Sequence, residues 1–330
     1  MHTRTWIALG AMLTAFTLAG CAGEEQESVS VGLITKQEEN PYWVSMRDVA
    51  QETADDLDVD LITATGVSDT DVASQEAALA DMVAEGVDGI LIAPTDPVAL
   101  LPAIQEARDA GVLVIALDTP VDPPETVDAF FATDNEAAGR SIGEYAAAKV
   151  EDLGLDPQVA LLNLAGDISS GELRRTGFLE GFGLTEDDPA IVASVDTQGD
   201  RDNAAVAMTQ VLSEHPDTNV VYTVNEPAAL GALAALEAAE LDLDEVVLVS
   251  VDGGCRAMRE AVRPGDIDAT ATQYPQNMAR EGVRAIAAAV RDGQAPSGFL
   301  DTGSELVSDN PVDGVESRRV EFGIRTCWGS

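Results

Sequence analysis

Polar and aromatic side chains follow several apolar runs of this sequence, at the points where each run ends. Lys36, Asn40 and the adjacent pair Tyr42-Trp43 come after the first run. The residues that follow later runs are Asp118, Thr119, Asn225, Glu226, Asp252 and Gln273. Ligands of open α/β sheets bind beyond the carboxyl ends of the strands. If the runs are parallel strands, these side chains are therefore candidates for one binding site.

The residue types in this set suit a neutral, polyhydroxylated ligand. A sugar hydroxyl both donates and accepts hydrogen bonds, so carboxylates, carboxamides and a guanidinium can together satisfy neighbouring hydroxyls. An aromatic ring can cover the apolar C–H face of a sugar ring. The sequence contains neither GxGxxG nor GxxxxGK[ST], which argues against a nucleotide phosphate site.

Each candidate also has a structural alternative. Tyr42 and Trp43 could pack in a core from the first turn of a helix. Asp118 and Asp252 could cap helix N-termini, and Asn225 could be a turn residue. Their shared position at the ends of apolar runs favours a site.

The runs that would position these residues are rich in β-branched residues and nearly continuous in apolar character, which is typical of strands buried on both faces. They cover residues 29–35, 59–66, 87–94, 112–119, 158–166, 191–199, 219–226, 245–254 and 268–274. Amphipathic segments between them predict helices, among them 72–85, 97–110, 137–152 and 203–214. This alternation predicts parallel sheets with helices on both faces. We therefore predict an α/β fold of two doubly wound lobes, divided after segment 128–135.

The charge of the chain excludes some partners. Lys and Arg total 18 against 59 Asp and Glu, for a net charge of −41. This charge repels phosphate backbones and opposes docking on anionic lipid, so we predict no nucleic-acid partner. It fits either a soluble exported protein of arginine-biased composition or adaptation to high salt, and both interpretations stay open.

Histidine and cysteine are too scarce for most metal sites and catalytic triads. The histidines are His2 and His215, and the chain has 3 cysteines, which cannot build a four-ligand zinc cage. An enzyme with a nucleophile–histidine pair would have to use His215, which lies in no recognisable motif. We predict no metal, no cofactor and no catalytic residue.

The N-terminus has the pattern of an export segment. A short basic start precedes an apolar run from Trp6 to Ala19, which is too short to span a bilayer comfortably and is typical of a signal peptide. The sequence LAGC at 18–21 resembles a bacterial lipobox, so residues 1–20 would be removed and Cys21 lipidated. The alternative is an ordinary signal peptide in which Cys21 is incidental. Residues 21–28 are predicted to form a lipidated, flexible tether.

The other two cysteines are Cys255 and Cys327. An exported protein meets an oxidising compartment, which suggests a disulfide that pins the C-terminal tail. The alternative is two separate buried thiols.

Several segments together resemble the periplasmic sugar-binding proteins of the ribose-binding type, and the fructose-type subgroup most closely. They are NPYW (40–43), GVDGILIAPTD (86–96), ARDAGVLVIALDT (107–119), ATDNEAAGRSIGEYAA (132–147), VNEPAALGA (224–232), SVDGG (250–254) and ATQYPQNMA (271–279). The resemblance covers residues 29–300. It implies a type I periplasmic-binding-protein fold, in which a three-strand hinge joins two lobes that close on a sugar. It implies a first lobe of 29–133 plus 273–300 and a second of 134–272 plus 301–330.

The resemblance also implies roles for the candidates. Asn40, Tyr42 and Trp43 match the polar and stacking positions of the first lobe, and Asp118 matches the carboxylate after the fourth strand. The positions that match second-lobe and hinge ligands are Asn225, Asp252 and Gln273.

The sequence departs from the ribose binders at several of the family's site positions. Thr119 stands where they have arginine, and Glu172 lies nearest their second-lobe arginine, which makes Arg174 the candidate donor. Gly199 lies near their second-lobe stacking aromatic. These departures disfavour ribose and favour a hexose or a sugar alcohol. Lys36, Thr119 and Glu226 remain weaker candidates.

The resemblance implies a lipid-anchored substrate-binding protein of an ABC importer. It would capture a monosaccharide, such as a fructose-like hexose, and deliver it to the permease. We expect a monomer that is exported and either anchored to the outer face of the cytoplasmic membrane or periplasmic. The alternative is a sensor of a sugar, polyol or autoinducer for a membrane signalling receptor. A glycosidase with paired carboxylates is weakly supported, and a sugar-responsive repressor would need a basic headpiece where the export segment lies.

Overall fold

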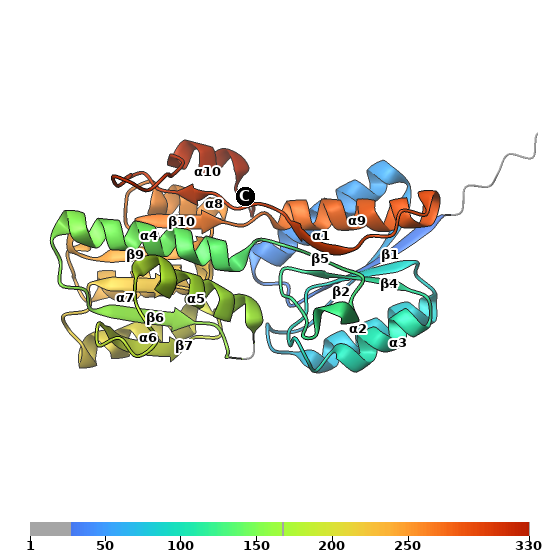
Figure 1. The fold of residues 1–330 in the computed structure, drawn as a ribbon, viewed down its shortest axis with the longest axis horizontal. Coiled ribbons are helices and arrows are strands. Elements are labelled where there is room, and N and C mark those ends of the chain that lie inside the picture. The colour runs from blue at the N-terminus through green and yellow to red at the C-terminus, as the bar shows by residue number, and fades with distance from the viewer. Residues whose placement is uncertain (1–27, 167, 330) are drawn as a thin grey trace, which may run out of the picture.

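The computed structural model describes residues 28–166 and 168–329, which form two lobes side by side along the longest axis (Figure 1). The predicted signal peptide at 1–20, the lipidation site Cys21 and all but the last residue of the tether lie outside the described residues. Within the described part, no helix is long and apolar enough to cross a membrane.

The first lobe is built on a six-stranded sheet in which all neighbouring strands are parallel. In pairing order the strands are β11 (Gly298–Asp301), β5 (Ala129–Ala132), β4 (Leu113–Leu117), β3 (Gly89–Ile92), β1 (Val29–Thr35) and β2 (Val59–Thr65). All four residues of β3 are buried, as expected for a central strand of a parallel sheet. The edge strand β11 is not among the predicted runs, because all of its residues are exposed and no buried apolar run marks it.

Helices cover both faces of this sheet. The helices α1 (Pro41–Leu57) and α9 (Pro275–Asp292) share one apolar core, and α2 (Val72–Glu85) and α3 (Leu101–Asp109) share the other. The short helix η1 (Pro124–Thr126) precedes β5. The helix predicted over 97–110 begins later, at Leu101, because Asp96 accepts hydrogen bonds from the N–H groups of Val98 and Ala99 and holds a turn there.

The second lobe repeats this plan with one antiparallel edge. In pairing order its strands are β12 (Leu306–Val307), β10 (Ala269–Thr272), β9 (Val247–Asp252), β8 (Val220–Thr223), β6 (Val159–Asn163) and β7 (Ile191–Asp196). Only the short β12, which no predicted run covers, pairs antiparallel. One core lies under α4 (Asn135–Leu153) and α5 (Ser169–Phe182). The helices around the other core are α6 (Arg201–Glu214), α7 (Glu226–Ala238), α8 (Cys255–Ala257), η3 (Met258–Val262) and α10 (Val320–Thr326), and η2 (Leu243–Glu245) precedes β9.

Glycines allow α4 and α5 to pack with their backbones in contact. A Cβ atom on Gly139 would lie 2.0 Å from the carbonyl oxygen of Arg174, and one on Gly177 would lie 2.0 Å from that of Glu136. No larger residue fits at such a distance, so these positions require glycine. The close packing fixes the part of α5 that carries Arg174.

The chain crosses between the lobes after β5, after β10 and between β11 and β12, at residues 133–134, 273–274 and 302–305. These crossings agree with the predicted fold of two doubly wound lobes and a three-strand hinge. The lobe boundaries at 29–133 plus 273–300 and 134–272 plus 301–330 stay a prediction, which the strand membership of the two sheets supports. The last described residues lie at the junction of the lobes (Figure 1).

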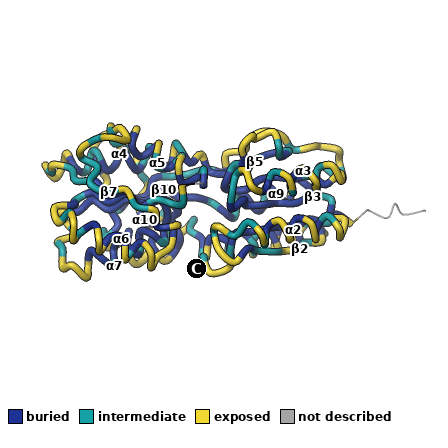
Figure 2. The backbone as a smooth tube through the Cα atoms, turned by 90° about the horizontal axis from the view of Figure 1, so that it is seen from below, coloured by how far each residue is buried: buried dark blue, intermediate teal, exposed yellow. Residues whose placement is uncertain are grey.

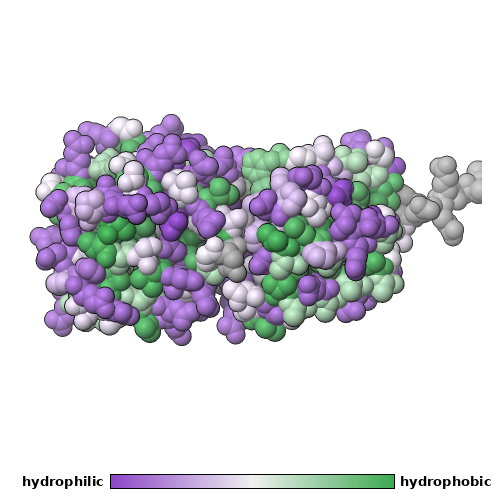
Figure 3. Space-filling view, turned by 60° about the horizontal axis from the view of Figure 1, so that its bottom comes forward, coloured by the Kyte–Doolittle hydropathy of each residue, from purple (hydrophilic) through white to green (hydrophobic). Residues whose placement is uncertain are grey.

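The interior and the surface of the two lobes differ as expected for water-soluble α/β domains. Buried strands run through the centre of each lobe, and the exposed residues lie on the outer helices and loops (Figure 2). Hydrophilic residues surround smaller hydrophobic patches on the face shown in Figure 3, where a waist divides the lobes.

Candidate functional site

A pocket with an empty volume of about 380 Å³ lies between the lobes, at the carboxyl ends of β1, β4, β8, β9 and β10. Part of this space is open to solvent, and the enclosed cavity is small, with a volume of about 40 Å³. Its lining residues are Lys36, Asn40, Tyr42, Trp43, Asp69, Asp118, Leu164, Ile168, Ser170, Arg174, Asn225, Asp252 and Gln273. The structure thus brings together every main candidate from the sequence.

The two central aspartates have unusual backbone conformations. Asp118 follows β4 with a φ of 63°, and Asp252 ends β9 with a φ of 111°. Non-glycine residues rarely adopt positive φ, and such strain concentrates at functional sites. At Asp118 the strain belongs to a three-residue turn, in which the Thr119 N–H donates to the Leu117 carbonyl at 2.6 Å.

Asp118 is held by hydroxyl groups of its own lobe. The Tyr42 hydroxyl donates to Asp118 Oδ1 at 2.9 Å, and the Thr119 hydroxyl donates to Oδ2 at 2.8 Å. Lys36 Nζ lies 3.9 Å from Oδ2 and donates to Thr119 Oγ1 at 2.9 Å. The carboxylate is therefore oriented before any ligand arrives.

Asp252 is held mainly by N–H groups. Gln273 Nε2 donates to its Oδ1 at 2.6 Å, and the backbone N–H of Glu226 donates to Oδ2 at 3.1 Å. Burial raises the pKa of the Asp252 carboxyl, and the Arg174 guanidinium and these hydrogen bonds oppose that shift.

Arg174 reaches from α5 toward both aspartates. Its Nη1 lies 3.5 Å from Asp252 Oδ1, and its Nη2 lies 3.8 Å from Asp118 Oδ1 in the other lobe. Its Nε donates to Asn135 Oδ1 at 2.7 Å, and Nη1 also donates to the Val224 carbonyl at 2.9 Å. The guanidinium is thus fixed between two carboxylates, whereas Glu172 is exposed.

The adjacent aromatics Tyr42 and Trp43 have different surroundings. The Tyr42 ring is packed edge-on between Trp43 and Trp328, with centroids 4.8 Å and 5.2 Å away. Burial, followed by the nearby charge of Asp118, raises the pKa of the Tyr42 hydroxyl well above its usual range. The Trp43 ring borders the pocket, with Lys36 Nζ 5.6 Å from its centroid. Both rings lie in the first-lobe core and border the pocket. They differ in their polar atoms, because the Tyr42 hydroxyl donates to Asp118 and Trp43 Nε1 has no partner within hydrogen-bond distance among the described residues.

The two asparagine candidates cap helices. The Asn40 side chain accepts from the Tyr42 N–H at the start of α1. Asn225 accepts from the Ala228 N–H at the start of α7 and donates to the Gly199 carbonyl. Their side chains line the pocket, but these hydrogen bonds already use part of their capacity.

Thr119 and Glu226 do not line the pocket. Thr119 is fully buried, and its Oγ1 lies 3.2 Å from Ser170 Oγ across the cleft. Glu226 turns its carboxylate to the Gly254 N–H. Burial, together with the charge of Asp252, raises the pKa of Glu226 to about 7.

The sequence analysis missed Asp69, Leu164, Ile168 and Ser170 among the lining residues. Asp69 lies in the loop after β2, so the same rule of strand ends could have found it. Burial raises the pKa of its carboxyl, and Lys36 opposes that shift most strongly. Leu164, Ile168 and Ser170 lie after β6, where their apolar or small side chains give no polar pattern to recognise.

Three buried polar atoms on the pocket lining lack a hydrogen-bond partner among the described residues. They are Trp43 Nε1, Asp69 Oδ1 and Gln273 Oε1. Trp43 Nε1 and Asp69 are close enough for the indole to lower the pKa of the Asp69 carboxyl. Gln273 Oε1 would gain from a ligand that supplies a donor. Within the described ranges, no group of three or more His, Cys, Asp or Glu side chains is arranged to hold a metal ion.

The chain is similar to known proteins over most of its length. Residues 31–295 match the family model of the periplasmic binding protein domain. The D-ribose/D-allose-binding protein of Pseudomonas aeruginosa is 28% identical over 317 residues, which cover 92% of this chain and 96% of that protein. The ribose import binding protein RbsB of Escherichia coli is 31% identical over 254 residues, or 77% of this chain and 82% of that protein.

Among solved structures, a carbohydrate transporter solute binding protein from Agrobacterium radiobacter, in complex with D-arabinose, superposes with a TM-score of 0.78. Its sequence identity is 27%, and the match covers 86% of this chain and 95% of that chain. The two-lobe architecture described above is therefore common to both.

Proposed function

The chain belongs to the periplasmic binding protein family, whose model matches residues 31–295, and we propose that its cleft binds one neutral monosaccharide for an ABC importer. The observation that carries this proposal is the convergence of donors and acceptors from both lobes on one pocket. Gln273 Oε1 lacks a donor, while Trp43 Nε1 and Asp69 interact without a hydrogen bond of normal length. A sugar hydroxyl both donates and accepts, so a few adjacent hydroxyls can satisfy these groups.

The charges that face the pocket favour a ligand without net charge. Asp118 and Asp252 lie 3.5–3.9 Å from the basic groups of Lys36 and Arg174. Burial raises the pKa of the third lining carboxyl group, Asp69, which disfavours its charged form. An anionic ligand would add negative charge next to the carboxylates. A cationic ligand would compete with the two basic side chains for the same carboxylates. A polyhydroxylated ligand instead accepts from the cations and donates to the carboxylates without changing this balance.

We infer that the sugar is a hexose, such as a fructose-like sugar, or a related compound. The relatives are named for ribose and allose, and the solved neighbour holds D-arabinose. Thr119 is buried between Asp118 and Ser170, so no arginine fork occupies that position. On the second lobe, Leu164 and Ile168 offer aliphatic contacts in place of an aromatic ring. Both features support a larger sugar than ribose.

The binding step is a closure of the lobes around the sugar, with no bond made or broken. Arg174 of the second lobe lies 3.8 Å from Asp118 of the first, and the Ser169 hydroxyl donates to the Pro120 carbonyl at 3.3 Å. A sugar that contacts both lobes binds the closed arrangement more tightly than the open one. It therefore shifts the equilibrium towards the closed arrangement. The relatives are named as binding proteins, and we assign this chain no catalytic residue.

We further propose that the mature protein is an exported monomer anchored by a lipid on Cys21, which presents the loaded cleft to the permease. The LAGC sequence at 18–21 supports the anchor, and the polar segment that follows would be the tether. Labelling with a radioactive fatty acid in a bacterial host tests the anchor. A chain with Cys21→Ser should take up no label.

A thermal-shift screen of pentoses, hexoses and polyols tests the ligand class, with protein lacking residues 1–21 at low and high salt. A sugar at 100 times its dissociation constant adds about 2.7 kcal/mol of stability. For a chain of this size this corresponds to a rise in melting temperature of roughly 4 °C. Sugar acids and amino acids serve as charged controls. If one of them stabilises the protein and no neutral sugar or polyol does, the proposal is wrong.

A further inference from the structure

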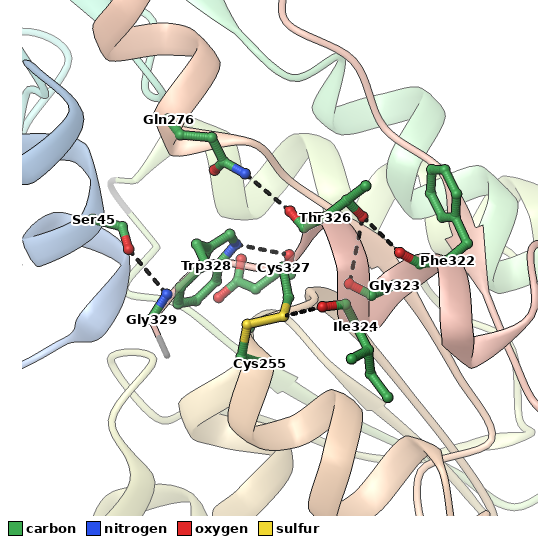
Figure 4. The surroundings of a disulfide bond; sticks show 12 residues. Ser45, Cys255, Gln276, Phe322, Gly323, Ile324, Thr326, Cys327, Trp328 and Gly329 are labelled. Atoms are coloured by element: carbon green, nitrogen blue, oxygen red, sulfur yellow. Dashed lines mark hydrogen bonds between the residues drawn. A yellow bond between two sulfur atoms is a disulfide. The ribbon is translucent and has the colours of Figure 1, made fainter. Parts of the chain in front are cut away.

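The last described residues form a fourth link between the lobes. We call Cys327, Trp328 and Gly329 the C-terminal tail. It leaves α10 of the second lobe, where Cys327 forms a disulfide with Cys255 at the start of α8 (Figure 4). The Cys255 N–H donates to the Trp328 carbonyl at 2.8 Å. Both bonds hold the tail firmly to the second lobe.

Beyond the disulfide, the tail contacts the first lobe. The Gly329 N–H donates to Ser45 Oγ on α1 at 3.0 Å. A Cβ atom on Gly329 would lie 2.7 Å from Pro41 Cβ, so the backbone passes directly over the start of α1. The Trp328 side chain is 5% exposed and is part of the first-lobe core.

Trp328 contacts residues of the sugar pocket from behind. Its indole Nε1 donates to the Gln273 carbonyl at 3.1 Å and to the Asp252 carbonyl at 3.3 Å. The Asp252 carbonyl belongs to a residue with a φ of 111°. The indole N–H therefore supports a strained backbone that aims the Asp252 carboxylate.

The same indole ring also contacts the other face of the site. It packs edge-on against Tyr42 at a centroid distance of 5.2 Å and an interplanar angle of 88°. Tyr42 in turn donates to Asp118. The Trp328 indole thus contacts Tyr42 of the first lobe, Asp252 of the second lobe and Gln273 of the hinge. Trp328 does not itself line the pocket.

We propose that Trp328 is a positioning residue of the sugar site, held in place by the Cys255–Cys327 disulfide. The inference rests on the proposed sugar-binding function. Trp328 sets the relative placement of Asp252, Gln273 and Tyr42 in the closed cleft. The disulfide at Cys327 removes much of the freedom of the neighbouring Trp328, so little entropy remains to be lost when the indole is ordered.

The test compares Trp328→Phe with wild type in the full mature chain, using whichever of D-fructose, D-allose and D-ribose wild type binds most tightly. Phenylalanine keeps a ring against Tyr42 but loses both N–H contacts. We expect an affinity about tenfold weaker by calorimetry, mainly through faster dissociation. The melting temperature without sugar should also fall, because Trp328 is buried in the first-lobe core, so the dissociation constant of the folded variant is the deciding measurement. A purely structural role would lower that temperature and leave the dissociation constant of the folded protein unchanged.

Phe322→Leu on α10 is the matched control, since Phe322 packs against the second-lobe core and is not among the residues that line the pocket. It should bind as wild type does. A Trp328→Phe chain with wild-type affinity overturns the proposal.

Wild type with its disulfide reduced provides a second measurement, which also decides the case if Trp328→Phe does not fold. Affinity should again weaken about tenfold as the tail is released. Unchanged affinity, with both thiols shown to be free, overturns the proposal. Failure of the sugar-binding function is seen separately, because oxidised wild type would then bind none of the sugars, and the role of Trp328 would fall with it.

Discussion

The two lobes present different chemistry to the cleft. The first lobe offers the Trp43 ring and a carboxylate, Asp118, whose closest partners are hydroxyl groups. The second lobe offers aliphatic side chains and a carboxylate, Asp252, whose closest partners are N–H groups. Hydroxyl groups can turn to new partners, whereas a buried backbone N–H cannot. The second-lobe face is therefore the more rigid of the two, and the less tolerant of change.

The largest expected effect separates the two aspartates. Asp252→Ala leaves the Gln273 amide and the Glu226 N–H unpaired and Arg174 with one carboxylate fewer. We expect sugar affinity to fall by about 1,000-fold, since hydrogen bonds to charged groups contribute about 1.5–3 kcal/mol each. Asp118→Ala should cost about 100-fold. Calorimetry on both variants measures the difference.

Asp60→Ala, which changes an exposed residue, is the control and should bind as wild type does. Equal losses of affinity in Asp118→Ala and Asp252→Ala would contradict the proposed difference between the lobes.

A second prediction uses the buried carboxyl group next to Asp252. The pKa of Glu226 is raised from 4.5 to about 7, so the folded protein holds this proton where the unfolded chain releases it. The contribution of Glu226 to stability is therefore greatest below about pH 4.5 and falls as the pH rises to about 7, by roughly 2–3 kcal/mol. Between pH 4.5 and 8, the free energy of unfolding measured in urea should therefore fall less with rising pH in Glu226→Gln than in wild type.

Some pH dependence should survive in Glu226→Gln, because burial also raises the pKa of Asp268 to about 6. The charges nearest Glu226 are Asp252 and Arg256, which act in opposite directions on its pKa. If the free energy of unfolding has the same pH dependence in the variant and in wild type, folding does not raise the pKa of Glu226. Its carboxyl group is then ionised in the second-lobe face at neutral pH.

A third prediction tests whether only one face stacks. Trp43→Ala removes the ring that borders the pocket and the unpaired Nε1, and we expect affinity to fall about 30-fold, or about 2 kcal/mol. Leu164→Ala on the opposite face should cost only a few-fold. Trp43→Phe is the matched variant that keeps a ring without the N–H. Comparable losses from Trp43→Ala and Leu164→Ala would mean that both faces hold the sugar equally.

The smallest expected effect concerns the contact between the faces. The Thr119 hydroxyl proton goes to Asp118, so the Ser170 hydroxyl donates across the cleft at 3.2 Å. Ser170→Ala removes one neutral hydrogen bond of the closed form, worth about 1 kcal/mol, and should weaken sugar binding about fivefold. Ser141→Ala, which changes a hydroxyl within α4, should leave binding unchanged. A normal dissociation rate in Ser170→Ala would show that this contact does not hold the lobes closed.

The sequence by itself determined the architecture and the location of the site. Continuous β-branched runs separated by amphipathic segments predicted two parallel-sheet lobes. Because parallel strands end at the same edge of a sheet, the residues after the runs were expected to converge, and Asp118, Asp252 and Gln273 do line one pocket. The strands that escaped prediction, β11 and β12, lie at sheet edges, where short or exposed segments leave no buried run.

Only the tertiary structure decided what each side chain does. It directs Tyr42 into the core, assigns the Asn40 and Asn225 oxygens to helix caps, and turns Glu226 away from the pocket. It also brings Trp328 from the far end of the chain to the back of Asp252. Side-chain direction depends on rotamers and on neighbours remote in sequence, and no local pattern encodes either. The chain order therefore fixed where the ligand groups gather, and the packing of the two lobes fixed which of their atoms remain for a ligand.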